Sequence, residues 1–235
     1  MNEINVIAKK GTDGNPGLTG LSGTTVDNGE NGSSTDHLCL RCVAATDGDP
    51  GNHGFDGKGG GDALHGEDAP ILILNIGAIP LSSLVIYVAS TGGRGGTGGQ
   101  GGQGGDGSDG GDGGKNTDTC LQKKKVQPSS GGKGGAAGNG GDGGTGGKGG
   151  DGGAITIHSQ DSTITARLNA VSNPGSGGTR GHLGKAGTKG AGGANEAYPR
   201  TDPPTYAQPG QPGTEGAEGQ PGHNGNPGKV SWPAV

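Results

Sequence analysis

The feature that most constrains the fold is a three-residue glycine repeat. Between residues 92 and 114 about two of every three residues are glycine, and polar side chains take most of the remaining places. This period has no apolar face, so it fits neither an α-helix nor a strand, but it matches the left-handed polyproline II helix, which has three residues per turn. Such a helix has no internal hydrogen bonds, and its backbone groups must pair with a neighbour or with water. We therefore expect an interior rod of a packed bundle.

Disorder is the first alternative to this interpretation. The chain has 62 glycines in 235 residues and only 2% aromatic residues, and such a composition buries too little apolar area to offset chain entropy. A disordered linker, however, has no physical reason to keep a three-residue phase over twenty residues. The regular period therefore favours order.

The same period recurs in six runs, which we treat as parts of a single composite domain, 1–235. Their ranges are 11–32, 48–66, 92–114, 131–153, 175–193 and 210–228. Runs of similar length joined by connectors most simply go up and down. We expect a bundle of about six antiparallel polyproline or polyglycine II helices with a small β-sheet or sandwich base at one end and essentially no α-helix.

The connectors alternate in character, which assigns them to opposite ends of the bundle. The apolar segments predict strands at the base, and we expect the middle four to form two hairpins. The polar links at the other end, the tip, are 33–47, 115–130 and 194–209. The expected base strands are 3–9, 71–76, 84–89, 154–158, 163–171 and 229–235.

Proline indicates which runs lie inside. It has no backbone N–H to donate, so it should avoid interior rods. The first, second and sixth runs contain proline or have it at an edge, whereas the third and fourth have none and are the richest in glycine. The middle of the sequence should therefore be the middle of the bundle. A collagen-like homotrimer is the structural rival, but glycine in two of three places lacks the imino acids that stabilise a triple helix.

Composition also excludes several classes of function. The net charge of −5, with both signs scattered, provides no basic patch for nucleic acid. The longest apolar run, 71–79, is too short to span a bilayer, and the N-terminal sequence lacks the pattern of a secretory signal peptide. We expect no nucleic-acid partner and no membrane span.

We find no motif for catalysis, for a cofactor or for a metal. No phosphate-binding loop sequence occurs, and aspartates three apart on one rod would stand about 9 Å apart, too far to share a calcium ion. His158, Asp161 and Ser162 lie on one predicted turn and cannot converge as a catalytic triad. The segment 104–111 partly matches a calcium-binding repeat, but its acidic side chains are interpreted as solvated.

The three cysteines allow several states. Cys39 and Cys42, with His37 beside them, suggest half of a metal site, but structural zinc normally needs a second pair of ligands. We favour thiols, with a bridge from Cys120 to one of the other two as the alternative.

The polar links are the candidate recognition surface. Lysines supply positive charge there, and tyrosines flanked by prolines supply the rigid amphipathic area that binding loops use. Links of this length also exceed what a simple reversal requires. The candidate receptor-binding residues are His37, Lys123, Lys124, Lys125, Tyr198, Arg200 and Tyr206.

Runs such as GGRGGTGGQGGQGG and GGTGGKGGDGG resemble those of the springtail antifreeze proteins, whose six antiparallel rods stack in two layers. Glycine-rich rods that end in exposed loops are also similar to the receptor-binding adhesins at the tail-fibre tips of T-even-like phages. The chain departs from both groups. Arg94, Lys133 and Lys148 interrupt the small, weakly polar row expected of an ice-binding surface, and the phage adhesins' long pure-glycine segments are missing.

These observations lead to three hypotheses. The leading one is a non-enzymatic binding module on an extracellular or virion surface, whose tip contacts a cell-surface receptor or a polysaccharide. The second is a structural or filament-forming protein that pairs with other copies of itself through edge strands. The third is an ice-binding protein.

Overall fold

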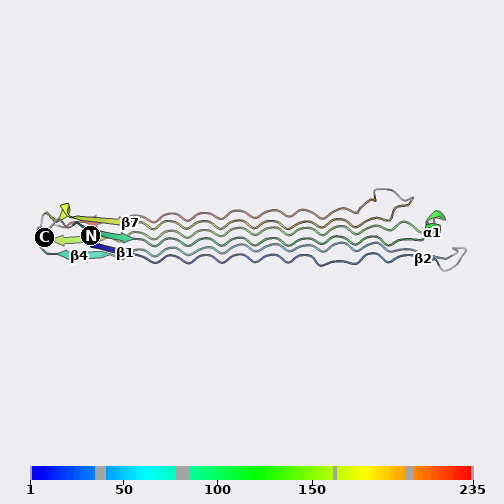
Figure 1. Ribbon diagram of the computed structural model, residues 1–235, viewed down its shortest axis with the longest axis horizontal. Helices are drawn as coiled ribbons and strands as arrows, with labels where there is room; N and C mark the ends of the chain where they lie inside the picture. Colours follow the sequence, from blue (N-terminus) through cyan, green and yellow to red (C-terminus); the bar gives the residue numbers. More distant parts are fainter. Residues whose placement is uncertain (1, 35–40, 78–84, 161–162, 199–203, 234–235) are drawn as a thin grey trace.

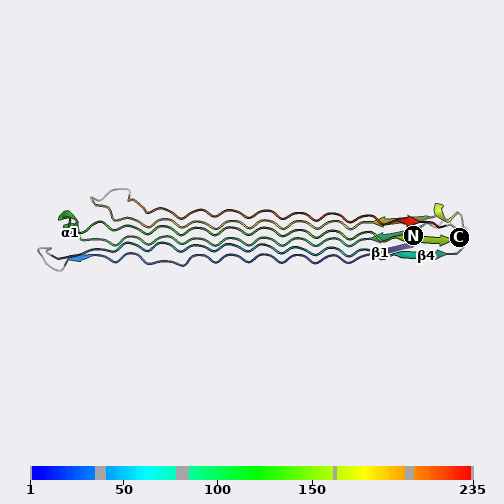
Figure 2. The same ribbon diagram turned by 180° about the vertical axis from the view of Figure 1, so that it is seen from behind.

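The computed structural model describes residues 2–34, 41–77, 85–160, 163–198 and 204–233. The molecule is long and narrow, with both termini at the strand-containing end and the polar links at the other end (Figure 1). The six glycine runs extend side by side along its length, and we call them rods 1 to 6 in chain order. The same arrangement is seen from behind in Figure 2.

Backbone hydrogen bonds sort the rods into two layers. Rods 1, 3 and 5 are parallel to one another: the N–H of Gly14 donates to the carbonyl of Thr97 at 2.8 Å, and the series continues every third residue. Rods 2, 4 and 6 form the second layer in the same way, as in the 2.8 Å bond from Gly57 N–H to the carbonyl of Asn139. Each layer is thus a set of parallel rods bonded laterally.

Bonds between the layers join antiparallel rods. Gly99 N–H donates to the carbonyl of Gly61, and Gly141 N–H donates to the carbonyl of Gly102, both at 2.8 Å. Rods 3 and 4 each bond to four other rods, whereas rods 1 and 6 each bond to two. This confirms the prediction, made from the proline and glycine content, that the third and fourth rods lie in the middle of the bundle.

Glycine is required where neighbouring rods meet, both within a layer and between the layers. A Cβ atom on Gly99 would lie 2.0 Å from the carbonyl oxygen of Asn15, and one on Gly98 would lie 2.1 Å from that of Gly144. No side chain fits into such a space. Because rod 3 contacts rods on two sides, two of its three rows must be free of side chains.

The strands form two small parallel sheets that continue the two layers. The first sheet has the order β1 (Asn2–Ile7), β5 (Ile86–Thr91) and β7 (Leu168–Asn173), and each strand leads into rod 1, 3 or 5. The second has the order β4 (Leu72–Ile76), β6 (Ile155–Ser159) and β8 (Val230–Ser231), which follow rods 2, 4 and 6. The buried side chains of Val88, Ile155, Ile157, Ile164 and Leu168 form the core between the sheets.

The two predicted hairpins are wrong. β4 and β5 belong to different sheets, as do β6 and β7, so each apolar connector crosses from one layer to the other. The cause is the rod order: rods that follow one another in sequence lie in opposite layers, and their strands cannot pair. The predicted strand 163–171 is also divided, because a short 3₁₀ helix, η1 (Ile164–Ala166), precedes β7.

The tip has little regular structure. It contains the short antiparallel pair β2 (Ser33–Ser34) and β3 (Cys42–Val43), and the five-residue helix α1 (Asp118–Gln122). α1 is the one α-helix in the part of the chain that the structure describes, so the protein has essentially no α-helix. None of the described helices has the length and apolar character needed to cross a membrane.

Candidate binding surface at the tip

Asn116 connects all three polar links. Its side chain is buried, with 8% of its surface exposed. Its Oδ1 accepts the N–H of Ala45 at 2.8 Å, from the first link, and its Nδ2 donates to the carbonyl of Gln127 at 3.1 Å, within the second. Nδ2 also donates to Glu196 Oε2, in the third link, at 2.5 Å. One buried amide therefore holds the three links in a single arrangement.

Glu196 completes this network. Its Oε1 accepts the backbone N–H of Asn116 at 2.6 Å, and its Oε2 accepts the N–H of Ser129 at 3.1 Å. The hydroxyl of Ser129, which is buried, donates to the carbonyl of Gly114. Since each of these buried polar groups has a partner, the tip gains rigidity without the cost of an unsatisfied group.

A disulfide bond joins Cys42 to Cys120 across 78 residues of sequence. It fastens the first link to α1, in which Cys120 is buried. The expectation of thiols is therefore wrong for these two residues, and the alternative of a bridge from Cys120 is the one observed. Cys39 lies outside the described residues.

Two hollows flank α1. The first, about 420 Å³, has a mixed polar and apolar lining, whose charged members are Asp112, Lys115, Asp118 and Glu196. The second, about 470 Å³, combines cationic, amide, apolar and aromatic groups. Its lining includes Gln122, Lys124, Val126, Gln127, Pro128 and Tyr198. Leu121 lines both hollows, so α1 forms the wall between them.

The second hollow brings two of the predicted site residues together. Lys124 and Tyr198, which come from different links, both line it. Lys123 and Lys125 are exposed beside Lys124, and the exposed Tyr206 forms an isolated antiparallel bridge with Ala194. His37 and Arg200 lie outside the described residues.

Lys124 has an unusual backbone conformation. Its φ of 51° lies in the left-handed region, and it directly follows Lys123, the residue that caps the C-terminal end of α1. Glycine or asparagine usually occupies such a position, because a side chain there costs about 1 kcal/mol. The conformation is held by hydrogen bonds from Lys124 N–H to the carbonyl of Leu121 and from Lys125 N–H to the carbonyl of Cys120, both at 2.9 Å. A strained lysine beside a hollow is the kind of feature found at functional sites.

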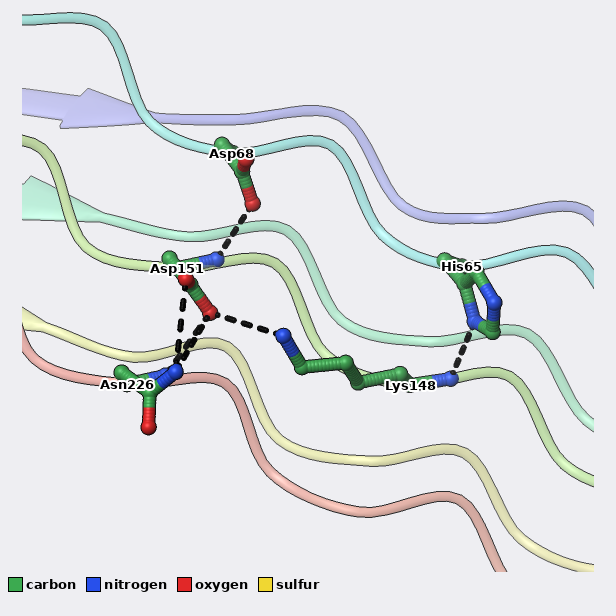
Figure 3. Close-up of polar contacts among 5 residues, drawn as sticks. All are labelled: His65, Asp68, Lys148, Asp151 and Asn226. Atoms are coloured by element: carbon green, nitrogen blue, oxygen red, sulfur yellow. Dashed lines mark hydrogen bonds and ion pairs between the residues drawn. The ribbon is translucent and has the colours of Figure 1, made fainter.

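The outward faces of the rods use their acidic side chains differently from what the sequence predicted. Asp13 Oδ1 accepts the N–H of Thr97 at 2.7 Å, and Asp62 Oδ1 accepts that of Thr145 at 2.6 Å. Figure 3 shows the same relationship between Asp68 and the N–H of Asp151, and between His65 Nδ1 and the N–H of Lys148. These carboxylates are exposed to solvent and also satisfy outward backbone donors of the next rod, a role that the sequence did not predict.

This bonding lowers the pKa of several of these carboxyl groups. The backbone N–H of Thr145 is the main cause for Asp62, that of Thr188 for Asp106 and that of Asn226 for Asp151. For Asp13 the Lys10 ammonium lowers the pKa most, followed by the N–H of Thr97. Each bond favours the charged form, because only an ionised carboxylate is a full acceptor. An alignment of the runs within one layer places each aspartate level with the residue whose N–H it accepts. That alignment is the sequence signal from which these bonds could have been predicted.

Within the ranges described, no group of three or more histidine, cysteine, aspartate or glutamate residues is placed to hold a metal ion.

The comparisons with known proteins provide little further guidance. No family model matches the chain, and no curated protein matches it. A solved structure of a springtail antifreeze protein from Granisotoma rainieri, described as a nine polyproline type II helical bundle whose crystal waters match the ice lattice, aligns with it at 24% identity. The alignment covers 92% of this chain and 95% of that one, with a TM-score of 0.12. A score this low does not establish a shared fold.

Proposed function

We propose that the chain is a non-enzymatic binding module of an extracellular or virion surface, in which a rigid stalk presents a recognition tip. The observation that carries this proposal is the hollow beside α1, where Lys124 and Tyr198 from separate links face a common space. The ligand class that fits this lining is a polysaccharide carrying anionic groups, on a cell surface.

In this proposal the stalk is a two-layer bundle of six polyglycine II helices. The three-residue repeat of the bonds between rods supports that conformation, because every third N–H then points toward the same neighbour. Most of the stability would come from backbone hydrogen bonding, since the apolar core is confined to the strand end. Such a stalk keeps the tip away from the end that carries both termini (Figure 2).

The tip is suited to binding because it is organised before a ligand arrives. The Asn116 and Glu196 network and the Cys42–Cys120 disulfide hold the links that form the hollow. Pre-organisation lowers the entropy cost of association. The Tyr198 ring, which is partly exposed, offers a flat apolar surface to a sugar ring, and the amides of Gln122 and Gln127 can pair with hydroxyl groups. The Lys124 ammonium attracts a carboxylate or a sulfate group.

The test is binding of the purified chain to a panel of neutral and anionic polysaccharides and to whole cells. Tyr198→Ala and Lys124→Ala should each weaken binding about tenfold or more, because each removes a direct contact. Matched controls are Tyr87→Ala in β5 and Lys185→Ala in the middle of rod 5, which change the same residue types far from the tip and should bind as the parent does. Equal binding by all four variants and the parent would refute the assignment to this hollow.

Ice binding has less support from the outward faces. The outward rows present charged side chains, among them Arg94, Asp106 and Lys185, rather than a flat row of small and weakly polar groups. A thermal-hysteresis measurement distinguishes the two functions, and activity there would favour the ice-binding alternative.

A further inference from the structure

Two open strand edges lie on the same narrow side of the molecule, the side formed by rods 1 and 2. Within the described residues β1 pairs with β5 alone and β4 with β6 alone. These edge strands have six and five residues, and they belong to antiparallel layers (Figure 1). Edge strands are usually protected by lysine, by proline or by being very short. The sequences NEINVI and LILNI contain neither lysine nor proline, and Glu3 is their one charged residue.

Large apolar side chains are exposed along the same side. Leu18 and Leu21 in rod 1 are both 74% exposed, and Phe55 in rod 2 is 66% exposed. Exposed leucines are common singly, but two successive leucines beside a phenylalanine of the neighbouring rod indicate an interaction surface. Leu64 in rod 2, at the same place in the triplet as Phe55, is 63% exposed.

The opposite side, formed by rods 5 and 6, has a different character. Arg180 Nε and Glu218 Oε2 form an ion pair there at 2.9 Å. The adjoining row of rod 6 carries Pro212, Glu215 and Pro221, and β8 has only two residues. The rod 1 and rod 2 side also carries charges, among them Lys9, Lys58 and Glu67, but its exposed leucines and Phe55 have no counterpart in rods 5 and 6, both of which the structure describes throughout. Association should therefore join like sides, which gives a closed twofold contact and not a filament.

We propose that a second copy of this chain binds to the rod 1 and rod 2 side, related by a twofold axis parallel to the rods. Residues of rods 1 and 2 that lie at one level are identified by their hydrogen bonds: Phe55 N–H donates to the carbonyl of Leu21 at 2.8 Å, and Glu67 N–H donates to that of Lys9 at 3.0 Å. The axis exchanges rod 1 with the partner's rod 2 at the same level. Leu21 then meets the partner's Phe55, and β1 lies antiparallel to the partner's β4, in position for strand pairing.

Charges along this side indicate where the contact is closest. Near the strands, Lys9 meets the partner's Glu67, an attractive pair that occurs twice because of the symmetry. Toward the tip, Asp27 meets the partner's Asp49, since Asp49 N–H donates to the carbonyl of Asp27 at 3.2 Å and the two residues share a level. This pair is repulsive. Between these two pairs, Leu18 meets the partner's Lys58, since Lys58 N–H donates to the carbonyl of Leu18 at 2.8 Å. The two copies should therefore be held together at the strand end and where Leu21 meets the partner's Phe55, and they should diverge toward the tip, which leaves both recognition surfaces free.

The experiment is sedimentation equilibrium or light scattering of the intact chain from low to high micromolar concentration. The expected species is a dimer with twice the 22.4 kDa chain mass. Leu21→Glu and Phe55→Glu should each weaken it about tenfold or more, because they place a charge in an apolar contact. Both positions are exposed in the monomer, so the variants should fold, which circular dichroism can verify. The control Val171→Glu alters an exposed apolar residue of β7, the edge strand on the other side, and should dimerise as the parent does.

Charge reversal tests the alignment of the two copies. Lys9→Glu should weaken the dimer, and combining it with Glu67→Lys should restore it, because the twofold axis pairs these positions. A monomer at all concentrations, long polymers, undiminished dimerisation of Leu21→Glu and Phe55→Glu, or failure of the double reversal to restore the dimer would each overturn the proposal.

Discussion

Thr188 donates twice to Asp106, a residue 82 positions earlier in the chain: its N–H and its hydroxyl both reach Oδ1, at 2.6 and 2.8 Å. Asp109 and Asp112 accept the N–H groups of Ala191 and Ala194 in the same way, both at 2.7 Å. A short polar side chain on one rod thus accepts an otherwise unpaired backbone N–H on the outward face of its neighbour. A capping residue satisfies the free N–H groups at the start of a helix in the same way.

Removing such an acceptor should destabilise the stalk. Asp106→Ala leaves the N–H of Thr188 without its protein partner, and we expect a lower free energy of unfolding. Asp106→Asn keeps an acceptor oxygen and should lose less. Denaturant unfolding measures the change, and Asp49→Ala, on the side row of rod 2, is the control that should leave stability within about 0.5 kcal/mol. An equal loss for both alanine variants would contradict this role.

The same bonds predict how stability depends on pH. The pKa of Asp13, Asp62, Asp106 and Asp151 is lowered in the folded protein. A group whose folded pKa is depressed contributes stability that is present above its unfolded pKa and is lost as the pH falls through the folded value. The melting temperature should therefore be nearly constant at neutral pH and should fall below about pH 4. Replacing these four aspartates by asparagine should flatten that fall, and an unchanged acid limb would count against the mechanism.

The glycine rows should not tolerate a single methyl group. In Gly99→Ala the added Cβ would lie 2.0 Å from the carbonyl oxygen of Asn15, so the rods would have to separate. We expect a loss of about 3 kcal/mol or more, at the upper end for overpacked sites. The matched control is Gly77→Ala, where no atom lies within 4 Å of the added Cβ. Thermal unfolding of both variants provides the comparison, and similar melting temperatures would be inconsistent with close backbone packing.

The disulfide should stabilise the tip more than the stalk. In the chain-entropy model, removing a disulfide that closes a loop of this length lowers the free energy of unfolding by about 4 kcal/mol. Because Cys42 and Cys120 lie beyond the rods, we expect the double variant Cys42→Ser with Cys120→Ser to raise amide exchange in the first two links while the interior rods stay protected. Hydrogen exchange measured by mass spectrometry resolves the two regions, and a uniform increase over the whole chain would argue against a local role.

The lysine at position 124 should raise the affinity for the ligand but lower the stability of the folded protein. Lys124→Gly relieves a left-handed backbone conformation and should raise stability by up to about 1 kcal/mol. If the proposed function is correct, the same variant loses affinity for anionic polysaccharides. Lys123→Gly is the comparison, since it makes the same change of residue type at the preceding position without a positive φ to relieve. If Lys124→Gly gained stability without losing affinity, the strained backbone of Lys124 would have no connection with ligand recognition.

Much of the fold could be predicted from the three-residue repeat in the sequence. Threefold glycine spacing located the six rods, and the distribution of proline correctly indicated that rods 3 and 4 lie between the others. These inferences worked because close backbone contact permits no side chain, a constraint that is visible residue by residue. The division into apolar and polar connectors likewise separated the strand end from the tip.

What could not be predicted depends on which rods are neighbours. Strand alternation in 71–76 and 84–89 is the same whether the two strands pair in a hairpin or lie in opposite sheets, so the hairpin was inferred wrongly. The acceptor role of Asp62 depends on Thr145 standing at the same level, which needs the lateral order of the rods. The bond between Cys42 and Cys120 depends in the same way on which links meet at the tip.

The rod pattern also makes length an adjustable quantity. Since every bond between rods repeats with the triplet, removing one triplet at the same level from all six rods would bring matching partners together again. With the proposed polyglycine II conformation, the stalk would shorten by about 9 Å with both ends unaltered. The length of such a stalk can therefore change in steps of one triplet per rod, and the contacts between the rods stay the same.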